Sequence, residues 1–376
     1  MVLFSDVIGN ELAKKSLENS LAQKRVSHSQ LFLGPKGSGA LPLAIAFARL
    51  LICQNKKDNS NCNIKISKFQ HPDLHFVYPV SQTNSVKSKA VSENFINEWR
   101  EFLTSNAYGD LIEWYNKIGV ENKQAKIGKD EANEIIKKVS LKPFEGGWKC
   151  VIVWMAEKMN SSATNKLLKI VEEPPKQTLF LFVCETTDNL LDTLVSRCQI
   201  TRLFSPKPKE IEKSLMKKGY SESDSKRATS LSGGNYSIAI SVAKGNYTHK
   251  VFEESFQIWV RLAFKVKSNL GSLLELIEWS NKISKQGREN QKSFLIFCAE
   301  YFRQAFLTNN NLDHLTTIEK NSNFNFSGFS RYITSNNIEE IHNELELAYS
   351  QIESNGNPNI IFSDLSLKLT KLMHKS

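Results

Sequence analysis

The sequence lacks the long hydrophobic runs that mark a membrane protein. Its apolar runs are short, and Leu179–Cys184 falls far below the roughly 20 residues that a membrane helix needs. The first residues show no basic region followed by an apolar stretch, so no secretory signal is visible. We therefore expect a cytoplasmic protein with no membrane partner.

Cysteine, glycine and proline are also scarce. Six cysteines, scattered along the chain, are too few for a disulfide scaffold. Seventeen glycines and ten prolines in 376 residues argue against collagen-like and low-complexity sequences, and 40% hydrophobic residues suffice for a sizeable core. The length predicts two or three globular domains.

Acidic residues are outnumbered in one part of the chain only. The whole chain has a formal net charge of +10. Residues 1–250 hold 36 Lys and Arg against 25 Asp and Glu, whereas residues 251–376 hold 13 against 14. The excess is densest in residues 201–250, with 10 against 4. A localised basic excess favours a partner such as nucleic acid, but many basic proteins bind none, so charge alone leaves both interpretations open.

Predicted strands and helices alternate in the first half of the chain. Gln30–Leu33, Trp148–Trp154 and Leu179–Val183 are short apolar runs bounded by turn residues, which is typical of buried parallel strands. Helix-competent segments lie between them, the clearest being Leu41–Cys53 and Asn165–Glu172. This alternation predicts an α/β fold with a parallel sheet.

Residues 81–130 form an insertion in this pattern. Phe95, Trp99 and Phe102 fall at helical spacing, and a second aromatic-rich helical segment follows at Ile112–Ile118. The favoured interpretation is a small helical hairpin that packs its own aromatic side chains. The alternative is an excursion that contacts protein or DNA.

The second half of the chain is predicted to be all-helical. Ser205–Pro208 is a hinge-like break, three short helical segments follow it, and long amphipathic helices run from about residue 250 onward. We predict an α/β module at residues 1–204, which includes the insertion at 81–130, then a helical lid at 205–248 and a helical domain at 249–376.

A glycine-rich turn follows the first strand. It is similar to the phosphate-binding loop G-x-x-x-x-G-K-[ST], in which backbone N–H groups cradle phosphates, the lysine contacts the β- and γ-phosphates and the hydroxyl holds Mg²⁺. Here Ala40 and Leu41 stand where the lysine and the hydroxyl belong, and Lys36 inside the loop is an imperfect substitute. The candidate nucleotide-binding residues are Gly34, Pro35, Lys36, Gly37, Ser38 and Gly39.

The neighbouring strand also lacks catalytic chemistry. A nucleotide-hydrolysing site needs a carboxylate at the end of that strand to hold Mg²⁺. The residues after Val151–Val153 are Trp154 and Met155, and we expect Glu157, a little further on, to face solvent. Losses in two strands are hard to reconcile with a working hydrolase.

With these motifs the chain resembles the bacterial sliding-clamp loaders, a family of AAA+ proteins. The likeness rests on Asn165–Pro175, on the later Thr186-Thr187-Asp188 and Ser196-Arg197-Cys198, and on the opening Phe4–Asn10 and His28–Pro35. It covers about residues 1–245, and the helices beyond fit the family's collar domain, which mediates oligomerisation. The resemblance implies an AAA+ P-loop-type module, a lid and a collar. Because the nucleotide motifs are degenerate, it also implies a subunit that does not hydrolyse ATP.

The same resemblance assigns roles to single residues. Arg197 would be an arginine finger, supplied in trans to the ATP of a neighbouring subunit, an effect of roughly 10³–10⁵ in rate in well-studied cases. Ser196 would position it, and Thr187 stands where the family senses the γ-phosphate. Ser237 takes the place of a nucleotide-sensing arginine, which is a third loss. Outside this motif, an ordinary surface arginine would be the simpler interpretation of Arg197.

Members of the family usually carry four zinc cysteines after the helix that follows the loop. Cys53 and Cys62 match the first two, but Lys65 and Lys68 stand at the third and fourth positions. A structural zinc site needs four closed ligands, so we expect no metal and no cofactor beyond weak binding of nucleotide. The alternative is a Cys/His site that uses His71 and a residue from elsewhere in the chain.

The resemblance thus implies a non-hydrolysing stator of a clamp loader. Its partners would be the gamma/tau and delta subunits, the sliding clamp and, through the assembly, primed DNA. Two other interpretations stay open. In the first, the chain would be a self-contained ATPase in which Lys36 and Glu157 replace the lost groups. In the second, it would be a helical adaptor with a decayed nucleotide fold that acts outside replication.

Overall fold

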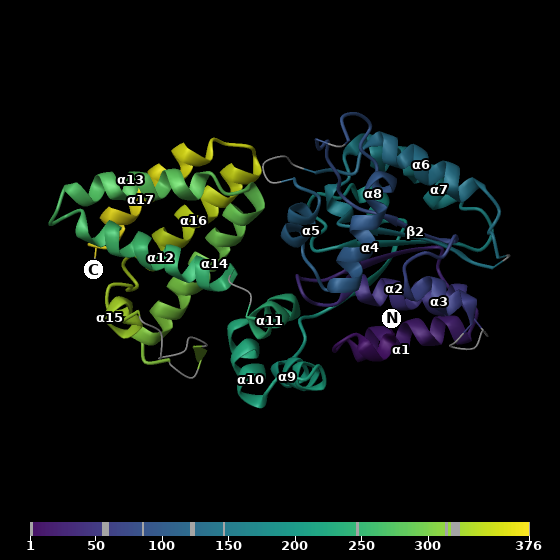
Figure 1. Cartoon of the computed structure of the whole chain (residues 1–376), viewed down its shortest axis with the longest axis horizontal. Coiled ribbons are helices and arrows are strands. Elements are labelled where there is room, and N and C mark those ends of the chain that lie inside the picture. Colours follow the sequence, from purple (N-terminus) through teal and green to yellow (C-terminus); the bar gives the residue numbers. More distant parts are fainter. Residues whose placement is uncertain are drawn as a thin grey trace. The chain divides into compact units, whose positions relative to one another are not determined.

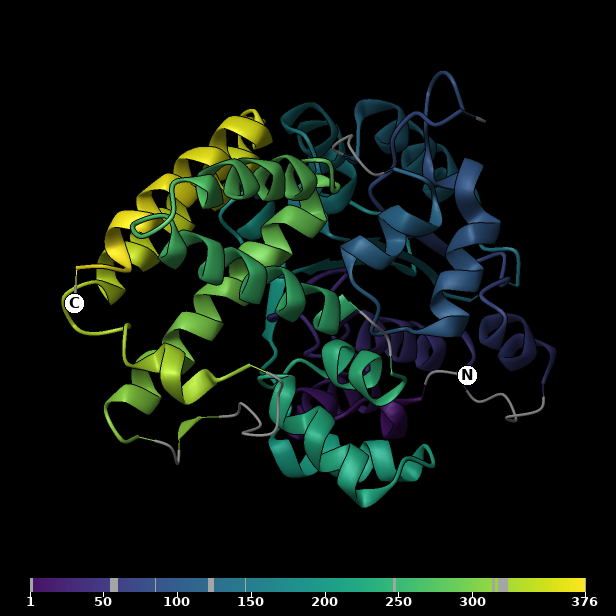
Figure 2. The ribbon, with the colours of Figure 1, turned by 60° about the vertical axis from the view of Figure 1, so that its left-hand side comes forward.

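A computed structural model of the chain divides it into two compact units, residues 1–243 and residues 244–376. Figures 1 and 2 show the ribbon in two views. None of the described helices is long and apolar enough to cross a membrane. The residues that the structure describes are 3–54, 60–84, 86–120, 125–145, 147–245, 248–312, 315–316 and 324–375.

A five-stranded parallel sheet forms the centre of the first unit (Figure 1). The strand order is β2-β3-β4-β1-β5, so β1 lies between β4 and β5. The strands are β1 Ser29–Leu33, β2 Leu74–Val77, β3 Lys149–Trp154, β4 Thr178–Cys184 and β5 Gln199–Arg202.

Helices cover both faces of this sheet. Along β3, Cys150 and Ile152 belong to the core on the side of α2, whereas Val151 and Val153 belong to the core on the side of α6 and α7. Both faces of the strand are therefore buried, which explains its continuous apolar run. The helices of this α/β part are η1 Phe4–Asp6, α1 Glu11–Ala22, α2 Ala40–Ile52, α3 Asn61–Ser67, η2 Ser92–Phe95, α4 Ile96–Ser105, α5 Leu111–Lys117, α6 Lys129–Ser140, η3 Ala156–Lys158, α7 Ser161–Glu172 and α8 Asp192–Val195.

The insertion does not pack on itself alone. Trp99 of α4 is fully buried and stacks on Tyr78, next to β2, with ring centroids 4.1 Å apart. It also lies 5.2 Å from the ring of Trp154 at the end of β3. The indole N–H of Trp114 in α5 donates to the carbonyl of Pro79 (2.8 Å). The predicted hairpin does pack its own aromatic side chains, because the rings of Trp99 and Trp114 meet edge to face with centroids 5.2 Å apart. The same rings also belong to the core of the α/β module, which the sequence did not predict. Residues 85 and 121–124 of the insertion lie outside the described part.

Three short helices complete the first unit and have a small core of their own. They are α9 Pro208–Lys217, α10 Glu222–Leu231 and α11 Tyr236–Ala243. Ile211, Leu215 and Ala239 are buried in this core, together with Ile8 from the start of the chain. We call α9–α11 the lid. The division into three domains stays a prediction.

The second unit is built entirely of helices in its described residues. Its core includes Trp259 and Trp279, whose rings are parallel and 5.1 Å apart, and the indole N–H of Trp259 donates to Ser366 Oγ (2.8 Å). The helices are α12 Thr248–Lys265, α13 Gly271–Ser284, α14 Arg288–Asn309, α15 Phe326–Ser330, α16 Ile338–Glu353 and α17 Pro358–Leu372.

The predicted fold class, α/β with a parallel sheet followed by all-α, is confirmed. The sequence patterns did not reveal β5, whose residues are mostly exposed, because an edge strand has no continuous apolar run.

Candidate functional site

The glycine-rich loop Gly34–Gly39 connects the end of β1 to the start of α2. Ser38 N–H donates to the Pro35 carbonyl (3.0 Å), and Gly34 N–H donates to the carbonyl of Cys184 at the end of β4 (3.2 Å). Gly37 and Gly39 have φ of +77° and +90°, a left-handed conformation that glycine adopts without strain. The loop therefore has the backbone shape of a phosphate cradle at a helix N-terminus.

The groups that would act on a phosphate are missing from this cradle. Ala40 and Leu41, in the first turn of α2, are buried and apolar. Ser38 is 1% exposed, and its Oγ has no hydrogen-bond partner among the described residues. Lys36 is half-buried within the loop.

The end of β3 is apolar as well. Trp154 and Met155 are buried and line a cavity of about 50 Å³ next to the loop. Glu157 was expected to face solvent, and this expectation is wrong: it is 8% exposed and its Oε1 accepts the N–H of Glu185 (3.0 Å). Burial raises the pKa of Glu157 to about 7. Its carboxyl group binds the backbone just after β4 and does not line the cavity.

Arg197 lies in the turn after α8 and is one-third exposed. Its Nε donates to Oε2 of Glu172 at the end of α7 (3.0 Å), and its Nη1 donates to the Thr193 carbonyl (2.8 Å). Ser196 Oγ donates to the same carbonyl (3.3 Å), and the thiol of Cys198 contacts Ser29 Oγ of β1 (3.0 Å). The turn is thus fixed to the sheet on one side and to α7 on the other, which restricts the guanidinium to a small region of the surface.

Two further residues singled out in the sequence bond to their own local backbone or side chains. Thr187 is half-buried in the loop after β4, and its carbonyl accepts the N–H of Leu190 (2.9 Å). Ser237 is buried in the first turn of α11, where its N–H donates to Oδ1 of Asn235 (3.0 Å). The sensing role of Thr187, and the loss of a sensing arginine at Ser237, stay predictions.

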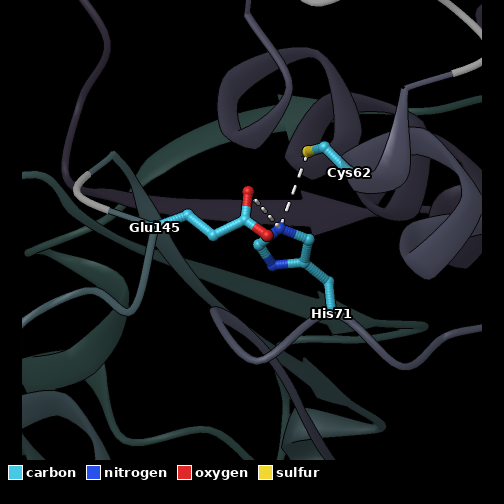
Figure 3. Close-up of side chains that lie close together, drawn as sticks. All are labelled: Cys62, His71 and Glu145. Carbon is cyan, nitrogen blue, oxygen red and sulfur yellow. Dashed lines mark hydrogen bonds and ion pairs between the residues drawn. The ribbon is translucent and has the colours of Figure 1, made fainter.

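A second group of reactive side chains lies near the end of α2. Cys62 Sγ, His71 Nε2 and the Glu145 carboxylate approach one another within 4.8 Å (Figure 3). The distance from Nε2 is 3.6 Å to Cys62 Sγ and 3.5 Å to Glu145 Oε2. The sequence pointed to Cys62 and His71 but not to Glu145, which follows an exposed loop and carries no motif of its own.

This group does not fit a zinc ion as it stands. Cys62 is joined to Cys53 by a disulfide, so neither sulfur is a thiolate. The N–H of Asp73 donates to Nδ1 of His71 (3.1 Å), which leaves the ring proton on Nε2, the atom that faces the other two groups. A zinc-bound histidine usually donates through its second nitrogen. The expected absence of zinc stays a prediction.

The surroundings explain why His71 is neutral. Burial lowers its pKa, and the nearby Glu145 carboxylate opposes this shift only in part. Glu145 itself pairs with Lys65 Nζ (2.9 Å), the lysine that stands at a family cysteine position. The disulfide and this polar group together join α2, α3 and the loop before β3.

Comparison with known proteins places these motifs in a family. Residues 9–207, more than half of the chain, match the model of the family described as DNA polymerase III, delta subunit. The chain is 31% identical over 213 residues to DNA polymerase III subunit delta' of Bacillus subtilis, a match that covers 55% of this chain and 51% of that protein. It is 23% identical to DNA polymerase III subunit tau of the same organism, covering 99% of this chain and 62% of that protein. The chain thus spans between half and two thirds of the length of these two relatives.

Among solved structures, a DNA polymerase III gamma subunit-related protein from Thermotoga maritima is 15% identical. The superposition covers 95% of this chain and 99% of that one, with a TM-score of 0.40.

Proposed function

Because this chain belongs to the DNA polymerase III delta subunit family, we propose that it acts as the delta-prime subunit of a clamp loader. In this role it is a stator that does not hydrolyse ATP and supplies Arg197 to the ATP of the neighbouring gamma/tau subunit. The proposal is supported by one observation: the same module has lost the catalytic groups of its nucleotide loop but has kept the arginine turn. The loop lacks its lysine and hydroxyl, at Ala40 and Leu41, while the Ser196-Arg197-Cys198 turn is intact and partly exposed.

The contacts of Arg197 suit a finger that acts on another subunit. A guanidinium has five N–H donors, and the bonds to Glu172 and to the Thr193 carbonyl use two of them. The remaining donors can bind the oxygens of a transferred phosphoryl group, where an arginine stabilises the developing charge. The bonds to Glu172 and Thr193 fix the side chain beforehand, so less side-chain entropy is lost when the neighbour docks.

The other parts of the proposal follow from the family. The partners are the gamma/tau and delta subunits, which together with this chain place the sliding clamp on primed DNA in the cytoplasm. The basic excess in the first unit supports a surface that faces DNA in the assembly.

The proposal predicts that Arg197→Ala leaves assembly intact but lowers the ATPase of the reconstituted clamp loader. The rate of ATP hydrolysis at the site next to this chain should fall by a factor of roughly 10³ or more. The total ATPase rate in the presence of DNA and clamp should therefore fall by the fraction that this one site contributes. Gel filtration measures assembly, and phosphate release measures turnover.

Arg202→Ala is the matched control. Arg202 is an exposed arginine of β5, close in sequence to Arg197, and its loss should leave turnover unchanged. Equal turnover in the wild-type and Arg197→Ala complexes would remove the finger assignment.

A further inference from the structure

The inserted segment reaches the phosphate loop. Residues 106–110, which we call the plug segment, form a tight turn between α4 and α5. Gly109 N–H donates to the Asn106 carbonyl (2.9 Å), and Tyr108 N–H donates to Asn106 Oδ1 (3.1 Å). Asp110 then caps α5, because its side chain accepts the N–H of Glu113 (2.9 Å). The turn is therefore held rigidly by its own residues and presents Tyr108 to the loop.

Tyr108 lies directly on the loop. A Cβ added to Gly39 would come within 3.1 Å of Cε1 and 3.2 Å of the hydroxyl of Tyr108. The Tyr108 hydroxyl accepts the N–H of Ile8, close to the start of the chain (2.8 Å). Burial raises the pKa of Tyr108, so the phenol stays neutral at physiological pH.

The lid closes on the same loop from another direction. A Cβ on Gly37 would lie 2.2 Å from Asn235 Oδ1 and 2.5 Å from the backbone nitrogen of Tyr236, at the start of α11. The ring of Tyr236 meets the ring of Tyr108 edge to face, with centroids 4.7 Å apart. The plug segment, the lid and the loop therefore touch one another in one place, all within the first unit.

Little space is left for a ligand. The cavity of about 50 Å³ is lined by loop residues, by Ala107–Asp110 and by the ends of β3 and β4. Sites for small molecules of nucleotide size have volumes of roughly 300–1,000 Å³. The plug segment forms one wall of this cavity, so a nucleotide on the loop would have to displace it.

We propose that the plug segment occupies the phosphate loop in place of a ligand. Tyr108 bridges the loop and the lid, as a bound ligand would, and thereby holds the lid closed without nucleotide. The inserted segment thus fixes the module in one conformation whether or not ATP is present. This inference goes beyond the role proposed for Arg197 and does not depend on it.

Hydrogen exchange of the full-length chain, followed by mass spectrometry, tests the proposal. In Tyr108→Ala, amides of the loop (residues 36–41) and of α11 should exchange about tenfold faster than in the wild type, because the contact of the Tyr108 ring with Tyr236 is lost. In Tyr108→Phe the ring remains, so only the amide of Ile8 should exchange faster. Added Mg²⁺ and ATP should leave exchange of the wild-type loop unchanged.

Phe144→Ala is the control, because Phe144 is a 78% exposed aromatic residue of the same module outside the plug segment. Loop and α11 exchange in Tyr108→Ala equal to that in Phe144→Ala would overturn the proposal, and so would protection of the wild-type loop by ATP.

A second variant covers the case in which Tyr108→Ala also loosens the sheet, seen as faster exchange in β3. Asn235→Ser removes the amide that lies over Gly37 but keeps a side-chain oxygen to cap α11. It should speed exchange in the loop and α11 while β3 is unchanged. If the loop amides of Asn235→Ser exchange at the wild-type rate, the proposal is overturned.

Discussion

Glu131 is a buried carboxylic acid that joins α6 to the inserted segment. It is 4% exposed, and its Oε2 accepts the N–H of Ser92 at the start of η2 (2.6 Å). Burial raises its pKa from 4.5 to about 7, although the Ser92 hydrogen bond opposes this shift. The folded state therefore favours the protonated acid. The contribution of Glu131 to the free energy of unfolding is fully present below pH 4.5 and is lost as the pH rises through about 7.

Glu131→Gln should remove most of the loss of stability at high pH, because a glutamine can accept the Ser92 N–H without carrying a charge. We expect the variant to exceed the wild type in stability at pH 8 by up to about 3 kcal/mol and to match it more closely at pH 5. Urea denaturation at both pH values measures the effect. Glu134→Gln removes an exposed charge from the same helix that adds only slightly to the raised pKa of Glu131, so it should change this pH dependence far less than Glu131→Gln does. A parallel pH profile of Glu131→Gln and wild type would contradict the assignment.

At the scale of elements, the inserted helices are part of the module that they interrupt. The ring of Trp99 stacks on Tyr78 beside β2 and contacts the ring of Trp154, at the end of β3, at a tilted angle. Trp154 stands where a hydrolase would carry its magnesium ligand. The helix before the plug segment thus packs on Trp154, the apolar residue at that position.

Trp99→Ala should therefore destabilise the first unit, not just the insertion. Removing a fully buried tryptophan costs about 3–5 kcal/mol, through lost burial and the cavity left behind. Leu141→Ala, at a 69% exposed position after α6, should stay within about 0.5 kcal/mol of the wild type. Urea unfolding, followed by exchange of β3 amides, measures both. Loss of protection confined to α4 and α5 would show that the insertion folds separately.

For the whole molecule, the two units differ in charge as well as in fold. Residues 1–243 hold 34 Lys and Arg against 25 Asp and Glu, whereas residues 244–376 hold 15 against 14. The phosphate loop, the lid and Arg197 all belong to the basic unit. In the proposed assembly this unit carries the contacts that concern nucleotide and DNA.

The isolated full-length chain should neither bind Mg²⁺-ATP in the micromolar range nor turn it over. The reason is that the loop lacks its lysine and hydroxyl and the cavity beside it measures about 50 Å³. Calorimetric titration and a phosphate-release assay check this, with a gamma/tau subunit in the same buffer as the positive control. Tight, magnesium-dependent binding with turnover would instead support a self-contained ATPase.

The order of the amino acids predicted the fold class and showed that the lysine and hydroxyl after Gly39 are missing. It also contains the Ser196-Arg197-Cys198 motif, for which the finger role is proposed. These are local properties: a short apolar run between turns predicts a buried strand, and the absence of a lysine after Gly39 is read directly. The sequence also singled out Cys53, Cys62 and His71 as neighbours by motif. The three-dimensional structure was needed to show that Cys53 and Cys62 are bonded, that Glu145 faces His71 and that Glu157 is buried. It alone brought Tyr108 and Asn235 onto the phosphate loop, because these contacts join residues far apart in the chain and depend on how helices pack at the ends of the strands.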